Sequence, residues 1–428
     1  MKKENVLRYF IHFLVIALAA AAFICDSPKA VFEGIKRIFL SESVLITDYF
    51  VVGGVGASLL NAAIVLAVCD VIVLVEKIPF TGITMAALFI NLGYGLWGKN
   101  PLNILPIICG VWIYAALHHA RLGRHIYTAL FGTCLAPFVT QLCYLLPFSA
   151  VLRVTAAVAT GITIGYLLPP ITMHTPSVHM GYNLFNGGFS GGILAFVVMS
   201  VLRSIGIESE SVLLWQAGRP PAIVIGLYLF FAAVFFLGLW CGGRAGGLKK
   251  LMSRPGRVVT DFVLMDGAGA AMMNMGLVGA VSTTYILLIG GDFSGPVVGS
   301  ILVAFGFAGF GAHLKNYIPV LLGVYLFTYI SRYEPTTPGI QLAALFCVGV
   351  APIAGQFGVI AGILAGMLHS AIVMCTAGMY GGLNLYNNGF SAGWVAMFMV
   401  PTLESFIKRY KTKEKRETRK EGHKGNDA

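Results

Sequence analysis

The chain carries, at Ile46–Val68, the stretch ITDYFVVGGVGASLLNAAIVLAV, and at Val259–Val281 the related stretch VTDFVLMDGAGAAMMNMGLVGAV. The two stretches align without a gap, and the alignment continues at the same offset to Gly110 in the first copy and Gly323 in the second. Self-similarity over such a length is the sequence sign of an internal duplication. We therefore expect two related halves in tandem.

Each half closes with a second shared motif. The motif reads GYNLFNGGFSGG at Gly181–Gly192 and GLNLYNNGFSAG at Gly382–Gly393. These landmarks divide the chain into a first repeat over 1–205, a linker over 206–217, a second repeat over 218–404 and a basic cytoplasmic tail over 405–428 that we expect to be disordered.

The composition is that of a membrane protein. The 428 residues are 57% hydrophobic and 11% charged, with a mean hydropathy of +0.82, whereas soluble domains carry roughly 25% charged residues. Apolar stretches recur along the chain, each near the ~20 residues that cross a bilayer as a helix. The two-residue alternation of a membrane β-barrel is not seen. We therefore predict an all-α fold, a polytopic transmembrane helical bundle.

The apolar segments number about seven in each half. In the first half they lie near residues 8–25, 55–76, 79–97, 103–118, 126–145, 151–169 and 184–202, and in the second near 221–241, 268–289, 293–311, 317–331, 340–356, 357–375 and 384–402. An odd number of crossings per half predicts an inverted-topology repeat, as in many transporters. Some of these segments are expected to be broken or re-entrant.

Charge sets the expected orientation. The basic loop Arg244–Arg257 falls on the same predicted side as both basic termini, and the acidic linker with Glu208 and Glu210 falls on the opposite side. Cytoplasmic loops carry an excess of Lys and Arg. The pattern predicts a cell-membrane protein with both termini in the cytoplasm. Lys36, Arg37 and Lys99 fall on the outer side and are exceptions to the rule.

The closing motif is the first candidate for a solute site. Its polar members are Asn183, Asn186 and Ser190 in the first half and Asn384, Asn387 and Ser391 in the second. Paired Gly residues and Asn disfavour a continuous helix. Irregular backbone at membrane depth survives only where protein or a water-filled cavity satisfies it, and it offers N–H and C=O groups as ligands. The alternative is a tight helix crossing with interhelical hydrogen bonds.

The second candidate is a Thr-Asp-aromatic motif followed by an Asn. Asp48 and Asp261 lie near a membrane boundary, and Asn61 and Asn274 follow them deeper in apolar surroundings. The two carboxylates are expected either to cap helix starts or to couple protons or ions. The two amides are expected to bind a polar solute or to form a cross-helix hydrogen bond.

Other chemistry has weaker signals. The eight Cys residues contain no C-x-x-C pair, and neither a metal site nor a cofactor is predicted. GFSGG at Gly188–Gly192 fits the G-x-S-x-G nucleophile pattern, so a membrane-embedded hydrolase using Ser190, or an enzyme using His174 and His179, is an alternative. The Lys- and Arg-rich tail allows a sensor or scaffold as a further alternative. It is typical of attraction to anionic lipid, and no nucleic-acid partner is expected.

The closing motifs and the Thr-Asp-aromatic motifs resemble a family of bacterial multi-pass membrane proteins known as a domain of unknown function. This resemblance covers nearly the whole chain and implies no activity. A more distant likeness in architecture is to the urea transporters, because Asn274–Gly279 reads NMGLVG and is followed by Pro319. The first half departs from that pattern, since the stretch after Asn61 lacks both glycines.

The sequence thus predicts an integral membrane transporter or channel for a small polar solute, not an enzyme. The path is expected at the interface of the two repeats. The expected partners are the solute and the lipid bilayer, and association into a homo-oligomer stays open.

Overall fold

The computed structural model describes residues 5–424, and within them the elements are helices joined by turns, with no strand. The first half contains α1 (Val6–Cys25), α2 (Pro28–Phe39), α3 (Tyr49–Gly53), α4 (Val55–Val75), α5 (Gly82–Tyr94), α6 (Pro101–Leu117), η2 (Leu122–His125), α7 (Ile126–Gly132), η3 (Thr133–Leu135), α8 (Ala136–Leu145), α9 (Ala150–Val178) and α10 (Asn186–Ser204). The second half contains α11 (Pro221–Trp240), α12 (Ala245–Leu251), α13 (Phe262–Asp266), α14 (Ala268–Leu288), α15 (Gly295–Phe307), α16 (Leu314–Ile330), α17 (Pro338–Phe346), η4 (Cys347–Val350), α18 (Ala351–Phe357), α19 (Val359–Thr376), η5 (Ala377–Tyr380) and α20 (Asn387–Lys424).

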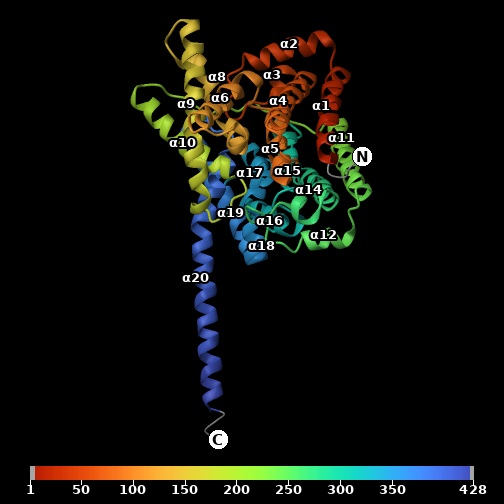
Figure 1. Cartoon of the computed structure of the whole chain (residues 1–428), viewed down its shortest axis with the longest axis vertical. Coiled ribbons are helices and arrows are strands. Elements are labelled where there is room, and N and C mark those ends of the chain that lie inside the picture. The colour runs from red at the N-terminus through yellow and green to blue at the C-terminus, as the bar shows by residue number, and fades with distance from the viewer. Residues whose placement is uncertain (1–4, 425–428) are drawn as a thin grey trace.

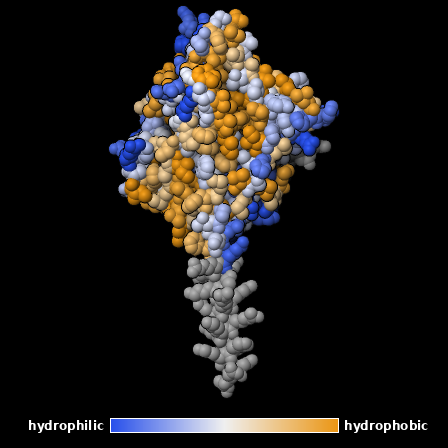
Figure 2. Space-filling model, turned by 90° about the vertical axis from the view of Figure 1, so that its left-hand side faces the viewer, coloured by the Kyte–Doolittle hydropathy of each residue, from blue (hydrophilic) through white to orange (hydrophobic). Residues whose placement is uncertain are grey.

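The bundle is built to sit in lipid. Within residues 5–424, nine helical segments are long and apolar enough to cross a bilayer. Figure 2 shows hydrophobic residues over much of the face to which α9 and α10 contribute. Large apolar side chains are exposed on the long helices, with Val151 of α9 at 79% and Phe398 of α20 at 65%. Apolar surface of this extent marks contact with a membrane. The chain is a membrane-spanning all-α protein, as the composition predicted.

The last helix extends far beyond the bundle. Figure 1 shows α20 running along the long axis of the molecule, past all other helices. Where we expected a disordered tail from residue 405, the structure continues α20 as far as Lys424, and residues 425–428 lie outside the described part. The sequence places Glu417 three residues before Lys420, a spacing that favours helix.

Two pairs of helices, α5 with α6 and α15 with α16, each form a hairpin. With 13 residues, α5 is about 20 Å long, too short for the ~30 Å core of a bilayer. Beyond α6 the Gly123 N–H donates to Oε2 of Glu76, just before α5, at 2.9 Å. In the second half the Asp292 N–H, just before α15, donates to Oε1 of Gln341, beyond α16, at 2.8 Å. The chain after each hairpin therefore lies beside the chain that precedes it.

The hairpins change the expected count of crossings. The segments near 79–97 and 103–118, and likewise 293–311 and 317–331, which we counted as four crossings, fold into two hairpins. The chain reverses just after α5 and after α15, at Gly98 and Gly311, whose φ angles are 82° and 88°. Glycine adopts this left-handed backbone without a steric penalty.

Glycines also set the packing of the hairpins against the next long helices. A side chain at Gly165 of α9 would meet the Ile107 carbonyl oxygen of α6 at 2.1 Å, and one at Gly366 of α19 would meet that of Val320 of α16 at 2.1 Å. The helices touch backbone to backbone, as small residues permit in membranes.

The two short helices lie at the centre of the bundle. All residues of α15 are buried, and in α5 only Ile83 is not fully buried. A helix that is apolar all round belongs in the interior. The hairpin tips are therefore surrounded by protein.

Candidate functional site

The helices α5 and α15 run antiparallel in close contact. A side chain at Gly93 would lie 2.4 Å from the Gly299 carbonyl oxygen, and one at Gly82 would lie 2.0 Å from that of Gly309. The rings of Phe89 and Phe305 pack between these ends, with centroids 4.6 Å apart. We call this region the central junction; it comprises α5, α15 and the segments 182–190 and 383–391, which reach it from the closing motifs.

Two carboxylates tie the halves together at the starts of these helices. Asp48 accepts from the Gly295 N–H of α15 at 3.1 Å and from Phe50 and Gln216 at 2.9 and 3.0 Å. Asp261 accepts from Gly82 and Ile83 of α5 at 2.9 and 3.1 Å. Each carboxylate also caps its own short helix, α3 or α13. The contacts of both carboxylates are thus those of helix caps. Each carboxylate also caps a helix in the other half.

Two amides hold the other ends of the same helices. Asn61 donates to the carbonyl oxygens of Gly95 and Lys99 at 2.7 and 2.8 Å. Asn274 donates to those of Ala308 and Ala312 at 2.8 Å each. These carbonyls follow the last turn of α5 or α15 and would otherwise lack partners. Within residues 5–424, both Oδ1 atoms are buried without a hydrogen-bond partner. The amides therefore form the cross-helix bonds of the alternative interpretation.

Asn186 and Asn387 make equivalent hydrogen bonds in the two closing motifs. Asn186 accepts from Thr175 at 2.7 Å and donates to the Thr172 carbonyl at 3.0 Å. Asn387 accepts from Thr376 at 2.6 Å and donates to the Val373 carbonyl at 3.1 Å. His179 adds a bond to Asn186, and Tyr380 adds one to Asn387. The amides fasten the starts of α10 and α20 to the preceding long helices.

The remaining pair of motif amides shapes the breaks before α10 and α20. Asn183 accepts from the Phe185 N–H at 2.8 Å, and Asn384 accepts from the Tyr386 N–H at 3.1 Å. Asn183 also donates to the Gly389 carbonyl at 3.0 Å, which joins the two motifs. A side chain at Gly188 would lie 3.0 Å from the Cα atom of Gly389. The two closing motifs therefore cross backbone to backbone at the junction.

The motif serines are buried and bonded locally. The Ser190 hydroxyl lies 3.0 Å from Oγ1 of Thr172 and 3.1 Å from the Asn186 carbonyl oxygen. The Ser391 hydroxyl has the corresponding bond to the Asn387 carbonyl at 3.1 Å. Among the described residues no histidine bonds to Ser190, and His174 is exposed. The general base that a serine nucleophile needs is therefore not within hydrogen-bond reach.

Two cavities meet at Asn388. A cavity of about 130 Å³ lies between α17, α19 and the segment Leu45–Ile46, and it reaches Asn387 and Asn388. A cavity of about 10 Å³ lies deeper in the junction and is also lined by Asn388. His369 bonds to Oδ1 of Asn388 at 3.1 Å, while within the described residues Nδ2 has no hydrogen bond. Among the described residues, the amide nitrogen of Asn388 is thus a polar group without a partner beside both cavities, and Nε1 of Trp97 is another beside the larger one.

A buried lysine lies beside the smaller cavity. Lys99 is 0% exposed, and its ammonium donates to Asn91 at 2.9 Å, to Thr133 at 2.7 Å and to the Tyr386 hydroxyl at 2.5 Å. It also lies 5.4 Å from the centroid of the Tyr94 ring. Within the described residues the ion pairs are His12–Asp70 and Arg254–Asp266, so no carboxylate pairs with Lys99. Burying an unpaired ion costs several kcal/mol.

The sequence analysis was wrong about the place of this lysine. We expected Lys99 on the outer side, because α5 was counted as a full crossing. The α5–α6 hairpin turns within the bundle, so its tip with Lys99 is in the interior.

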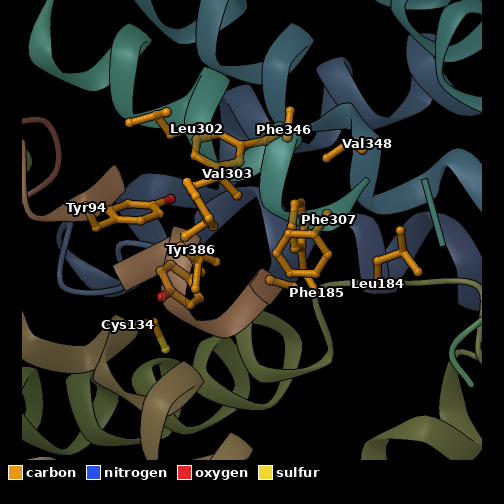
Figure 3. Packing of buried hydrophobic residues seen from close by; sticks show 14 of the residues in the cluster. Tyr94, Cys134, Leu184, Phe185, Leu302, Val303, Phe307, Phe346, Val348 and Tyr386 are labelled. Atoms are coloured by element: carbon orange, nitrogen blue, oxygen red, sulfur yellow. The ribbon is translucent and has the colours of Figure 1, made fainter. Parts of the chain in front are cut away.

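The corresponding place in the second half is apolar. The polar residues Asn91, Tyr94, Lys99, Thr133 and Tyr386 correspond to Ala304, Phe307, Ala312, Val348 and Phe185. All five counterparts are buried. Figure 3 shows Tyr94 and Tyr386 on one side of the junction, and Phe185 and Phe307 on the other. The same backbone geometry therefore packs without a charge, and the fold does not require the lysine.

Comparison with known proteins gives a family. A family model described as "Protein of unknown function (DUF1576)" matches residues 27–204 and 243–405, which is most of the chain. The chain belongs to the DUF1576 family. No curated protein and no solved structure matches the chain. The resemblance to a family of unknown function is thus confirmed, and the likeness to urea transporters stays an expectation.

In this DUF1576 chain the whole central junction lies within the matched stretches, Lys99 and Asn388 included. The sequence analysis predicted neither residue as part of a site, and it named Lys99 only as an exception to the charge rule. Their signal was an asymmetry in the duplication, because Lys99 stands opposite Ala312 and Asn388 opposite Gly187. Lys99 is also the sole Asp, Glu, Lys or Arg between Lys77 and Arg121.

A larger cavity of the DUF1576 chain, about 960 Å³, lies between α1, α11 and the start of α14. Arg8, Lys77 and Arg244 line it, together with Asp266, which pairs with Arg254 at 2.7 Å. None of the predicted site residues lines this cavity. In the described residues no group of His, Cys, Asp or Glu side chains could hold a metal ion.

Proposed function

We propose that this protein is a transporter or channel for a small polar solute, with the path through the central junction. The observation that carries the proposal is the pair of cavities that meet at Asn388. Binding sites in transporters lie near the bilayer midplane, where discontinuous helices meet. Here the short helix α5 and the two broken segments line the smaller cavity, and the second broken segment also reaches the larger one.

We further propose that the two halves have opposite orientations. The antiparallel contact of α5 with α15 supports this, as do the reciprocal caps by Asp48 and Asp261. The basic loop after α11 is then cytoplasmic and the linker with Glu208 is external. The proposed arrangement is still an inverted repeat, but the two hairpins no longer count as membrane crossings.

The proposed path begins at the 130 Å³ cavity beside Leu45 and Ile46, which lies on the external side in this orientation. It passes Asn388 and enters the smaller cavity, where Tyr94, Phe185 and Tyr386 surround a space of about 10 Å³. That space holds about one water molecule. The structure is therefore closed at these rings, and passage requires them to move.

The proposed roles of the predicted residues follow their contacts. Asn387 lines the larger cavity and is retained with Asn388 as a solute ligand. Asn61, Asn274, Asn183, Asn186, Asn384, Ser190 and Ser391 shape the path by holding the backbone around it. The contacts of Asp48 and Asp261 support capping in preference to proton coupling.

Flux through proteoliposomes tests the proposal. The panel is urea, formamide, formate, ammonium and glycerol, each measured against protein-free liposomes. At least one solute should cross faster with protein present. Asn388→Leu removes a polar group and fills the meeting point of the cavities, so the flux of that solute should fall roughly tenfold or more.

The matched control is Thr163→Leu, the same kind of change on the exposed face of α9. Its flux should equal that of the unmodified protein. Flux that survives Asn388→Leu undiminished in folded protein would remove the junction from the path. A panel in which no solute crosses counts against transport itself.

A further inference from the structure

We propose that Lys99 and Tyr386 form a binding site for a small monovalent anion, of the size of formate or nitrate. This inference rests on the proposed function for its route of entry, and it replaces the expectation of an uncharged solute. The site lies at the turn between α5 and α6, where the Lys99 ammonium meets the start of α20.

The first step is the charge of the site. The three donor hydrogens of the Lys99 ammonium are matched by Asn91, Thr133 and Tyr386, all of which are neutral acceptors. Among the described residues no carboxylate lies within ion-pair distance of it. A buried cation without an anion is costly, and ionisable groups at such depth mark substrate or ion pathways. A bound anion would supply the counter-charge that the described residues do not.

The second step is the comparison within the chain. The second half packs the equivalent place with Ala304, Ala312 and Val348, opposite Phe185. These apolar residues are buried and fill the equivalent space in the second half. Apolar replacement of a buried charge is often neutral or stabilising, so packing does not account for the polar cluster.

The third step is access. Tyr386 lines the 10 Å³ cavity, and its hydroxyl accepts from the ammonium. Asn388, two residues further on, lines both that cavity and the larger one. An anion that passes Asn388 therefore meets Tyr386 first. Rotation of the Tyr386 ring frees one ammonium hydrogen for the anion, and the hydroxyl becomes a second donor to it. The cramped space selects ions of few atoms.

Formate and formamide are the matched probes, because they have nearly the same size and differ in charge. In proteoliposomes, formate should cross at least about tenfold faster than formamide, and a membrane potential should drive it. Lys99→Met keeps the length of the side chain and removes the charge. Formate flux should then fall roughly 100-fold, the size of effect expected on removing one partner of a buried charge pair. Formamide flux should not fall.

A second variant distinguishes loss of the anion site from misfolding of the protein. Lys99→Ala, Asn91→Ala, Tyr94→Phe, Thr133→Val and Tyr386→Phe together copy the apolar site of the second half, so this variant should fold and should lose formate flux. Lys315→Met, which removes an exposed lysine at the corresponding turn, should retain it.

Binding is measured separately from flux. Formate and nitrate should raise the Tm of detergent-solubilised protein, and Lys99→Met should abolish this shift while Lys315→Met retains it. An equal shift in Lys99→Met would overturn the inference, as would formate flux unchanged by Lys99→Met. If formamide crosses and formate neither crosses nor binds, transport stands and the anion site fails. If formate binds through Lys99 and no solute crosses, the anion site stands and transport fails.

Discussion

At the scale of single residues, the polar groups of the junction divide into those that hold backbone and those that remain free. Asn61 and Asn274 donate both amide hydrogens to carbonyl groups beyond the ends of α5 and α15. Asn388 keeps its amide nitrogen free at the cavities. Residue type does not distinguish these roles, since all three are buried asparagines in helices.

Asn61→Ala and Asn274→Ala should therefore act on stability. Each removes two hydrogen bonds and leaves two buried carbonyls unsatisfied, so the free energy of unfolding should fall by about 2–4 kcal/mol. Unfolding by SDS in mixed micelles measures the change. Ser200→Ala, on the exposed face of α10, serves as the control and should change little. Full stability of both Asn variants would show that these bonds do not hold the hairpins.

At the scale of helices, the close contact of α5 with α15 depends on glycine. The backbones approach so closely that a Cβ atom on Gly93 would be 2.4 Å from the Gly299 carbonyl oxygen, and one on Gly299 would be 2.3 Å from that of Gly93. Such distances cannot be relieved by a side-chain rotation, because the obstacle is backbone. The helix pair would have to separate and thereby disturb both capped ends.

Gly93→Ala and Gly299→Ala should each destabilise the protein by about 1–3 kcal/mol, the cost of overpacking. Gly226→Ala is the matched control, since Gly226 lies in α11 with no neighbour within 4 Å of an added Cβ. It should be neutral or stabilising by up to about 1 kcal/mol, because Ala favours helix over Gly. Unfolding by SDS in mixed micelles measures the stability of all three variants. A Gly93 variant as stable as the Gly226 variant would contradict the contact.

At the scale of the whole molecule, the reciprocal caps make the two halves one structure. Asp48 of the first half caps a helix of the second, and Asp261 of the second caps a helix of the first. With the proposed opposite orientation, the linker and the basic loop lie on opposite faces of the membrane.

Cysteine labelling in intact cells tests this arrangement. Glu208→Cys in the linker and Lys249→Cys in the basic loop both place a thiol at an exposed position. A membrane-impermeant maleimide should label the Glu208 variant from outside and the Lys249 variant only after permeabilisation. The background carries Cys25→Ser and Cys375→Ser, because these native thiols are exposed. Labelling of both variants from outside would contradict opposite faces.

The sequence by itself determined the membrane character, the duplication and the breaks before α10 and α20. These are properties of local composition and of repetition along the chain, which require no knowledge of contacts. Apolar length predicts a helix in lipid, and paired glycines predict its interruption. Two short apolar segments and a turn, however, fit a hairpin as well as two crossings.

The tertiary structure decided that choice, and with it the site. Because the α5–α6 hairpin returns, Lys99 lies in the interior, where Tyr386 from the far end of the chain supplies its third hydrogen bond. The free amide of Asn388 and the reciprocal caps likewise depend on contacts between residues far apart in sequence. Such contacts follow from the way helices pack, and a pattern of residue types along one chain does not contain them.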